Sequence, residues 1–459
     1  MPRRRGEDVR TQRAAYIEPM SNEENSELAR GRVIVTYGRS LMSLAIARSL
    51  HERGVEIIGC DDVGMTALSF SKNISGYFTH PVRTEKPEAF LDKMVEKARQ
   101  YRPADGRPYV LMPAFEGMRF FAQHRERFDG IIDIAAPDFA AIDRVDPKDH
   151  LMGWAAEQGL PAPQTVKVTS EDELRAAAET VRFPVMLKAP DKVGGRGVTK
   201  AANAQELMAQ YKKLVADRAL VQEFIEGVDY CHTVIFEHGE LKGSMAYKNL
   251  RQWPRTSGAG VLRETVDDAP FLETSKKLLG PLGWNGIAEI DYRWSEEGGD
   301  PAFLIEVNPR FWAGLYHSIA SGVDFPWMLY ELTVTGRVLS DYERHIGERT
   351  RIPGVAMLSA VTDIAHSETD FRKLREAWRD AGRSFKEGHV GDAVRRFAKS
   401  VGEVIDHDDI AFELFQAADD VRGVRGELSF KEDRMANLGF LYVVSSIIRH
   451  GELPPEMKH

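Results

Sequence analysis

The most constraining feature of this chain is an apolar segment, residues 303–310, that carries polar side chains at alternate positions. Its sequence is Phe-Leu-Ile-Glu-Val-Asn-Pro-Arg, so the polar positions are Glu306, Asn308 and Arg310. Alternate side chains of a β-strand share a face, which predicts that all three point the same way. Two oxygen ligands beside a guanidinium suit a site that holds Mg²⁺ on a polyphosphate. The alternative is a strand end whose polar face is merely solvated.

A second strand with polar side chains on one face is expected 15 residues earlier, at residues 286–293. Glu289, Asp291 and Arg293 share a face there by the same alternation. Residues 295–300 read as a hairpin turn, and folding this hairpin would bring Asp291 near Glu306. Together with Asn308, these side chains could hold one or two Mg²⁺ ions. The spacing leaves Glu289 open as the first metal ligand instead of Asp291.

Composition excludes several classes of protein. The 459 residues suffice for three or four structural units, and 43% hydrophobic with 29% charged residues is typical of a soluble globular chain. A net charge of −9 argues against nucleic acid as the main partner. Two cysteines, Cys60 and Cys231, provide no disulfide framework, which fits a cytoplasmic location. The sequence has no apolar run of 18 residues, so no transmembrane helix is expected.

Strand and helix signals alternate over residues 32–145 after an N-terminal stretch, residues 1–31, that reads as a flexible tail. This alternation predicts a parallel sheet with helices on both faces. The first strand-to-helix turn, Gly38-Arg39-Ser40, lacks the G-x-G-x-x-G pattern, so a nicotinamide-dependent dehydrogenase is not expected. The turn could still bind a substrate carboxylate, and a plain turn with a capping serine is the alternative.

Two segments have the composition of a nucleotide site. A buried strand ends at Lys188 and is followed by the glycine-rich sequence Gly194, Gly195, Arg196, Gly197, whose backbone amides could surround phosphate oxygens. Further on, an apolar slot for adenine is expected at Gln222, Glu223, Phe224 and Ile225, with Asp229 as a ribose ligand. Flexible hairpins are the alternative for both segments.

A carboxylate substrate would need a cationic partner. Lys248 and Arg251 are the best candidates, in a segment that reads as a loop after a strand ending at Tyr247. A solvated basic loop is the alternative. The C-terminal residues, 336–459, have helical spacing and no motif that indicates a site; they are expected to pack on the catalytic unit or to form a dimer contact.

The order of Lys188, the glycine-rich loop, residues 222–227, Asp291 and residues 306–310 resembles the ATP-grasp superfamily. Its members include biotin carboxylase, carbamoyl phosphate synthetase and D-alanine–D-alanine ligase, and this chain is most similar to stand-alone carboxylate–amine ligases. The resemblance implies a mixed α/β and α+β fold in four parts. These are the tail, a parallel α/β (pre-ATP-grasp) domain at residues 32–145, a catalytic domain at 146–335 with lobes near 146–218 and 219–335, and a mostly helical extension at 336–459.

The resemblance also implies ligands and roles. ATP and Mg²⁺ would be bound, with Mn²⁺ as a substitute. For the nucleotide, the resemblance implies that Lys148 and Lys188 contact the phosphates, that Gly194–Gly197 form a lid over them, that Glu223 and Ile225 flank adenine and that Asp229 binds the ribose. For the metal, it implies Asp291, Glu306 and Asn308 as ligands. Arg310 would stabilise the transferring phosphoryl group.

The implied reaction joins a small-molecule carboxylate, such as an amino acid, to an amine. The carboxylate attacks the γ-phosphate of ATP to form an acyl phosphate and ADP, and the amine then displaces phosphate to leave an amide. Another ATP-grasp reaction, by a carboxylase or a small-molecule kinase, is the first alternative. A non-catalytic ATP-binding regulatory or scaffold protein is the second.

Overall fold

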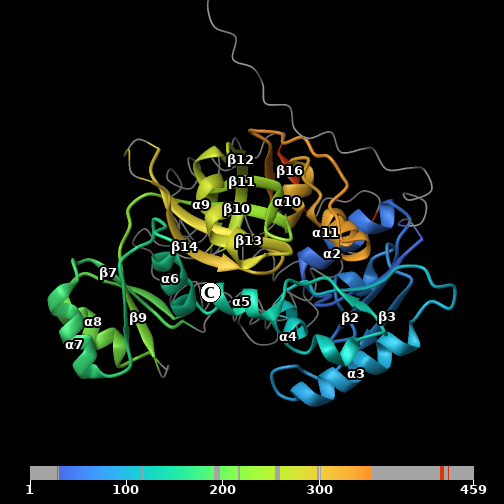
Figure 1. Ribbon diagram of the computed structural model, residues 1–459, viewed down its shortest axis with the longest axis horizontal. Coiled ribbons are helices and arrows are strands. Elements are labelled where there is room, and N and C mark those ends of the chain that lie inside the picture. Colours follow the sequence, from blue (N-terminus) through green and yellow to red (C-terminus); the bar gives the residue numbers. More distant parts are fainter. Residues whose placement is uncertain are drawn as a thin grey trace, which may run out of the picture.

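Three β-sheets organise the part of the chain that the computed structural model describes (Figure 1). The described residues are 28, 30–115, 117–190, 197–214, 218–253, 259–296, 299, 301–352, 424–427 and 433. The predicted N-terminal tail and most of the predicted helical extension therefore lie outside the described residues. The described part of that extension contributes two short strands, β15 (Arg349–Arg351) and β16 (Arg425–Gly426).

The N-terminal sheet has five parallel strands in the order β3-β2-β1-β4-β5. Their bounds are β1 (Arg32–Val35), β2 (Glu56–Asp61), β3 (Gly76–Thr79), β4 (Tyr109–Met112) and β5 (Asp133–Ile134). The helices of this part are α2 (Leu41–Glu52), α3 (Pro87–Gln100), α4 (Gly117–Gln123) and α5 (Phe139–Val145), with 3-10 turns η1 (Leu68–Phe70) and η2 (Arg125–Phe128).

Helices cover both faces of this sheet because its strands are apolar on both sides. Val33 and Val35 pack in one core with α2, whereas Ile34 between them packs in a second core with α3. The predicted parallel α/β architecture is therefore confirmed. The edge strand β3 was not among the strands expected from the sequence.

A small four-stranded sheet forms a separate lobe on the left of Figure 1. Its order is β6-β9-β7-β8, and all its pairs are antiparallel. The elements are β6 (Thr165–Val168), α7 (Glu171–Thr180), β7 (Val185–Lys188), β8 (Val198–Ala201), α8 (Ala204–Tyr211) and β9 (Ala219–Glu223). Leu174 of α7 and Leu207 of α8 pack against Leu187 and Val221 of the strands, so the lobe has its own small core.

The large sheet has the order β14-β13-β10-β11-β12-β15-β16, antiparallel except for the last pair. Its strands before β15 are β10 (Val228–Glu237), β11 (Glu240–Trp253), β12 (Ala259–Val266), β13 (Gly286–Trp294) and β14 (Phe303–Asn308). The associated helices are α6 (Lys148–Glu157), α9 (Ala269–Leu279), α10 (Leu315–Ala320) and α11 (Phe325–Thr335), with the 3-10 turn η3 (Gly280–Leu282).

The two faces of the large sheet pack against different partners. Helices α6 and α9 share a core with one face through Leu151 and Phe271. The opposite face, which carries Cys231 and Tyr247, shares a core with α2, α10 and α11. Because α11 contacts strands of both the N-terminal and the large sheet, this second face is turned toward the N-terminal sheet (Figure 1).

Within the described residues, none of the helices combines the length and the apolar character that crossing a bilayer requires.

Candidate active site

A row of polar side chains crosses four strands of the large sheet. In the antiparallel register, Tyr247 of β11 lies opposite Cys231 of β10, Cys231 opposite Asp291 of β13, and Asp291 opposite Glu306 of β14. Glu289 lies two residues before Asp291 on β13 and opposite Asn308. The hairpin expected from the sequence thus brings the proposed metal ligands onto adjacent strands.

The carboxylates of this row lie close together, with Glu289 buried and Asp291 and Glu306 partly buried. Tyr247 Oη donates a hydrogen bond of 2.6 Å to Glu289 Oε1, and Asn308 Nδ2 donates to Asp291 Oδ2 at 3.2 Å and to Glu289 Oε2 at 3.4 Å. Burial, and then the neighbouring carboxylates Glu289 and Glu306, raise the pKa of Asp291 well above its usual range. Burial likewise raises the pKa of Glu289, against the hydrogen bond from Tyr247.

This arrangement fits a hard divalent cation. Several carboxylate oxygens share a site in which each disfavours ionisation of the others, so a cation would stabilise the charged forms. Asp291, Glu306 and Asn308 remain the proposed ligands. Glu289 lies at the same place and remains the alternative first ligand.

Two lysines from different parts of the fold approach Glu306. Lys148 begins α6, and its Nζ lies 2.7 Å from Glu306 Oε1. Lys188 ends β7 in the small lobe and is almost completely buried. Burial lowers the pKa of Lys188 to about 8; the Lys148 ammonium acts in the same direction, and the Glu306 carboxylate opposes both. The predicted phosphate lysines therefore meet the predicted metal carboxylates.

Arg310 faces the N-terminal sheet. Its Nη2 donates to Asn308 Oδ1 at 2.7 Å and its Nη1 to the Phe311 carbonyl at 2.9 Å. The guanidinium carbon lies 4.5 Å from the centre of the Phe115 ring, and Phe115 stacks on Tyr37 with ring centres 5.1 Å apart. Phe115 and Tyr37 follow strands β4 and β1, so the carboxyl edge of the N-terminal sheet closes the site on this side.

The segment proposed to bind adenine follows the last strand of the small lobe. Gln222 is buried and its amide donates to Thr165 Oγ1 at 2.9 Å, so it holds β9 to β6. Glu223 ends β9, and its backbone amide donates to the Gln164 carbonyl at 2.9 Å. The Phe224 ring lies 3.6 Å from the Lys200 ammonium, and Ile225 is half-buried.

Asp229 and Gly197 are two further described residues that the sequence assigned to the nucleotide site. Asp229 of β10 forms an ion pair with Arg293, which lies opposite it on β13. Gly197 has a φ of +70°, which glycine adopts without strain, and its carbonyl accepts a hydrogen bond from the Ala189 amide. The other glycine-rich residues named from the sequence, Gly194, Gly195 and Arg196, lie outside the described residues.

Lys248 is not brought together with Arg310. Strand β11 continues to Trp253 instead of ending at Tyr247, so the expected loop is a strand. Adjacent strand residues point to opposite faces, which places Lys248 away from the face of Tyr247; its Nζ lies 3.5 Å from Glu264 Oε1 on β12. Arg251 follows a register shift later in β11, and its role stays a prediction.

Arg263 of β12 lies near Tyr247 and Glu289. It is fully buried, and its Nη1 lies 2.6 Å from Glu427 Oε1. Glu427 belongs to the short described segment near β16, which no sequence pattern linked to the site. Tyr247 and Phe115 were also missed, although the alternation of β11 could have placed Tyr247 on the face of the carboxylates.

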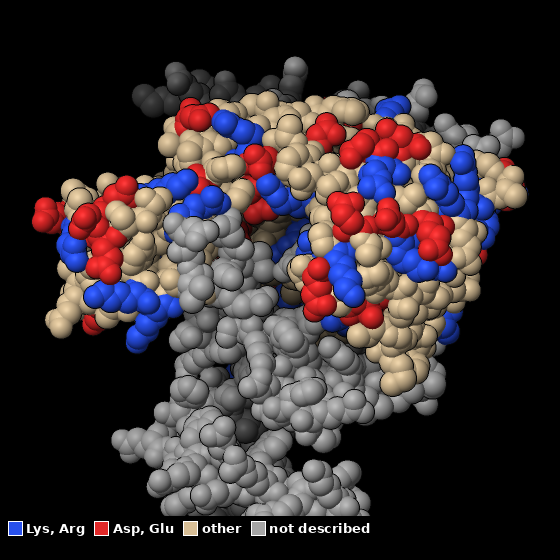
Figure 2. Space-filling view, turned by 90° about the horizontal axis from the view of Figure 1, so that it is seen from below, with Lys and Arg blue, Asp and Glu red and all other residues tan. Residues whose placement is uncertain are grey.

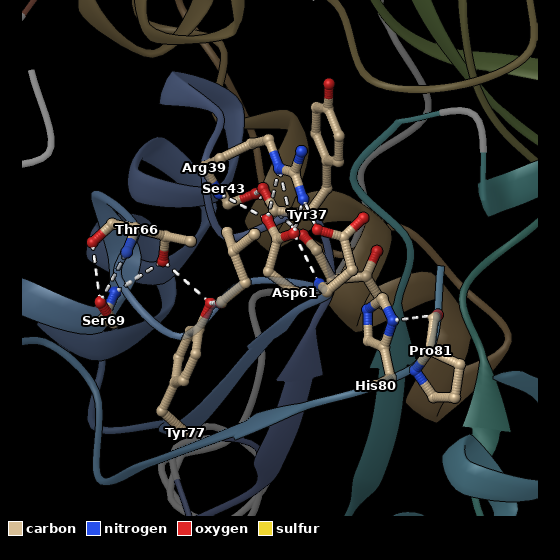
Figure 3. Close-up of polar contacts among 12 residues, drawn as sticks. Tyr37, Arg39, Ser43, Asp61, Thr66, Ser69, Tyr77, His80 and Pro81 are labelled. Atoms are coloured by element: carbon tan, nitrogen blue, oxygen red, sulfur yellow. Dashed lines mark hydrogen bonds and ion pairs between the residues drawn. The ribbon is translucent and has the colours of Figure 1, made fainter. Parts of the chain in front are cut away.

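A second polar cluster lies at the carboxyl edge of the N-terminal sheet (Figure 3). The backbone amide of Arg39 donates to Asp61 Oδ2 at 2.9 Å, and its guanidinium binds both Asp61 and Asp62. The amide at the Gly38-Arg39-Ser40 turn is thus bound by a carboxylate of the protein itself. Tyr37, which precedes the turn, has a φ of +59°, a strained conformation for a bulky residue.

The face of the molecule that is drawn in Figure 2 carries charges of both signs. Figure 2 shows Lys and Arg interspersed with Asp and Glu on this face, and charged side chains also lie where the small lobe meets the rest of the molecule. Such mixing over the visible described surface differs from the continuous basic stripe that a nucleic-acid backbone attracts.

Two family models match overlapping segments of the chain. Residues 146–228 match the model described as carbamoyl-phosphate synthase L chain, ATP binding domain. Residues 216–352 match the model described as ATP-grasp in the biosynthetic pathway with Ter operon. These segments contain the small lobe and the whole row from Tyr247 to Glu306.

Known proteins show the same likeness. A carbamoyl-phosphate synthase of Methanobrevibacter smithii is 26% identical over 186 residues, which are 39% of this chain and 49% of that protein, so the match spans about half of the relative's length. The biotin carboxylase domain of Hydrogenobacter thermophilus 2-oxoglutarate carboxylase, solved with MgADP, ADP and bicarbonate, aligns with a TM-score of 0.55 and 16% identity over 69% of this chain and 73% of that one.

An L-amino acid ligase from Bacillus licheniformis aligns with a TM-score of 0.53 and 15% identity, over 67% of this chain and 74% of that one. At these identities the solved structures establish a shared fold.

Proposed function

Because this chain belongs to the ATP-grasp superfamily, we propose that it is an ATP-dependent carboxylate–amine ligase. It would join a small acid, such as an amino acid, to an amine and convert ATP to ADP and phosphate. The likeness to an amino acid ligase fold supports this choice, and the likeness to biotin carboxylase domains makes a carboxylase the competing function.

The observation that carries the proposal is the convergence on Glu306 of Lys148 from α6, Lys188 from the small lobe and Asp291 from β13. Phosphoryl transfer depends mainly on positioning and on neutralising charge. Two buried ammonium groups beside a set of carboxylates provide positive charge for phosphates and negative charge for their metal.

Asp291, Glu306 and Asn308 would hold Mg²⁺, with one or two ions and with Mn²⁺ as a substitute. The metal supplies positive charge to the polyphosphate when it is bound. Asn308 in the structure donates its amide protons to carboxylates and accepts from Arg310, so its oxygen is already directed by the guanidinium. Arg310 would stabilise charge on the transferring phosphoryl group.

The nucleotide would lie between the small lobe and the large sheet. Gln222, Glu223, Phe224 and Ile225 would line the adenine slot, Asp229 would bind the ribose, and Gly194–Gly197 would cover the phosphates. Phe224 supports this placement because its ring already lies against the Lys200 ammonium at one end of β9 and β10.

The acid would bind beside Arg310, on the side closed by the N-terminal sheet. Its carboxylate would attack the γ-phosphate and release ADP, and the amine would then displace phosphate from the acyl phosphate. Phe115 and Tyr37 line this side.

A hydroxylamine trap tests the proposal. The full chain is incubated with Mg-ATP, hydroxylamine and a panel of carboxylic acids that includes amino acids, and both ADP and hydroxamate are measured. Hydroxylamine replaces the unidentified amine, so hydroxamate formed together with ADP identifies the activated acid. A parallel assay replaces the acids with bicarbonate or with alcohols. ADP formed there, without hydroxamate for any acid, would instead support a carboxylase or a kinase.

A further inference from the structure

The thiol of Cys231 lies within the carboxylate row and has no role in the proposed reaction. Cys231 and Asp291 are directly opposite on the paired strands β10 and β13, and Glu289 shares the strand of Asp291. One ligand atom from each of these three residues lies within 4.8 Å of the other two. Cys231 and Glu289 are each 8% exposed, so two of the three side chains of the cluster are buried.

We propose that Cys231, Glu289 and Asp291 form a second metal site, which takes a thiophilic divalent cation such as Zn²⁺ or Cd²⁺. Thiolate and carboxylate are ligands of such ions, with bonds of about 2.3 Å to sulfur and about 2.0–2.2 Å to oxygen. Tetrahedral ligands at those bond lengths are separated by roughly 3.6 Å. The ligand atoms, which lie within 4.8 Å of one another, therefore need to move together by about 1.2 Å at most, a distance that side-chain rotation can supply.

The strands hold these donors in place before any ion arrives. Directly opposite residues of an antiparallel pair have Cβ atoms about 4.5–5.5 Å apart, which fixes Cys231 relative to Asp291. The hydroxyl of Tyr247 orients Glu289 from the next strand, at 2.6 Å from its Oε1. Asp291 is only partly buried, so an ion can reach the cluster from solvent through this residue. On binding, the thiol releases its proton to solvent and its sulfur bonds to the ion.

The other cysteine shows what a thiol without this role looks like. Cys60 is fully buried in β2, and its Sγ donates to the Val35 carbonyl at 3.7 Å, with Phe78 and Ile58 in the same core. The two thiols therefore form a matched pair: both are buried strand residues, but only Cys231 belongs to a group of metal-ligating side chains among the described residues.

Asp291 belongs to both this cluster and the proposed magnesium site. The two ions would therefore exclude one another, and a thiophilic ion would inhibit ATP turnover by withdrawing Asp291. This consequence rests on the proposed function, whereas binding of the thiophilic ion does not.

The experiment is a titration of the metal-free full chain with Cd²⁺, followed through the ultraviolet charge-transfer absorption of a sulfur–cadmium bond. We expect one equivalent to bind with this band in the wild type and in Cys60→Ser, and the band to be absent in Cys231→Ser. A band that survives in Cys231→Ser, or is absent from the wild type, would overturn the proposal.

A second variant tests the carboxylate without touching sulfur. Glu289→Gln keeps the size of the side chain and the thiol, and should raise the dissociation constant for Cd²⁺ by about tenfold or more. An unchanged constant would remove Glu289 from the site and contradict the proposal as stated. Circular dichroism and thermal melting of each variant confirm that it is folded.

Competition with Mg²⁺ separates the two proposals. If Asp291 is shared, millimolar Mg²⁺ weakens Cd²⁺ binding in the wild type, and Cd²⁺ that binds equally well at every Mg²⁺ concentration would overturn the shared ligand. None of these readouts requires turnover, so a failure of the proposed ligase function leaves the cadmium result intact.

Discussion

Lys148 Nζ lies 2.7 Å from Glu306 Oε1 and joins the first turn of α6 to β14, the strand that carries two of the three proposed metal ligands. The ammonium balances one carboxylate of the set, to which Lys188 and Arg310 bring further positive charge. Mg²⁺ would bring positive charge and the polyphosphate negative charge, so the metal could bind Glu306 while a phosphate oxygen binds Lys148. On binding, the contact between Lys148 and Glu306 would thus be replaced by a contact of Lys148 with phosphate and a contact of Glu306 with the metal.

The first prediction concerns the charge of Glu306. Glu306→Gln keeps the shape of the side chain but removes a negative charge from the metal site and from the ion pair with Lys148. Turnover should fall by roughly 100-fold or more, which corresponds to about 3 kcal/mol of transition-state stabilisation. Steady-state ADP release with the acid found by the hydroxylamine trap measures the loss.

Glu273→Gln on α9 is the matched control, because Glu273 is exposed and pairs with the neighbouring Lys276. It should retain full activity. Near-normal turnover in Glu306→Gln would exclude Glu306 as a metal ligand.

The second prediction is a proton uptake by Lys188. Burial lowers its pKa to about 8, so above that pH a growing fraction of the free protein has a neutral amine at this position. Bound phosphates favour the ammonium, raise its pKa and draw a proton from solvent. ATP affinity should therefore fall by up to about tenfold per pH unit above pH 8, and the effect should end near the ordinary lysine pKa of about 10.4.

Calorimetry near pH 8.5 in two buffers of different ionisation enthalpy measures this uptake directly. Lys188→Arg is the control, since a guanidinium stays charged over the whole range and should bind ATP without taking up a proton. Equal proton uptake by the wild type and Lys188→Arg would assign it to another group.

The sequence could place the core of the site because the relevant rule is local. Alternation sets Glu306, Asn308 and Arg310 on one face, and a short hairpin then leaves little freedom in how Asp291 meets Glu306. The same rule, applied one strand further, would have separated Lys248 from Tyr247. Residues 248–253 have the polar composition of a loop although they pair with β12, so their composition hides the strand.

The remaining contacts depend on register between distant segments, which local patterns do not encode. Tyr247 and Cys231 meet Asp291 only because β11, β10 and β13 are neighbours in that order. Phe115 reaches Arg310 only because the N-terminal sheet packs beside the large sheet. Side-chain chemistry showed what the site contains, whereas the order of the strands decides which groups touch.

The third prediction concerns the buried pair of Arg263 and Glu427. Both side chains are 1% exposed, the pair is 2.6 Å apart, and Thr350 Oγ1 also donates to Glu427 Oε1 at 2.8 Å. Glu427→Ala leaves the guanidinium buried without a counterion, which should lower the free energy of unfolding by about 3–5 kcal/mol. Urea denaturation followed by circular dichroism measures the change.

Glu348→Ala is the comparison, because its partner Arg425 is exposed and their nearest charged atoms are 3.9 Å apart. Loss of that pair should cost about 0–1 kcal/mol. Equal effects of the two substitutions would show that the Arg263–Glu427 pair does not tie the segment near β16 to the sheet.

The fourth prediction concerns the ring beneath Arg310. Phe115→Leu keeps an apolar side chain but removes the aromatic face that lies 4.5 Å from the guanidinium carbon. If Arg310 acts on the transferring phosphoryl group, kcat should fall by roughly 2- to 30-fold, which corresponds to about 0.5–2 kcal/mol, while the KM for ATP changes little. Phe120→Leu is the matched control, since the Phe120 ring lies beneath Arg83 in the same part of the fold. The same loss of kcat in both variants would indicate a general effect on the N-terminal sheet, whereas a loss confined to Phe115→Leu would place the aromatic pair in the machinery that positions Arg310.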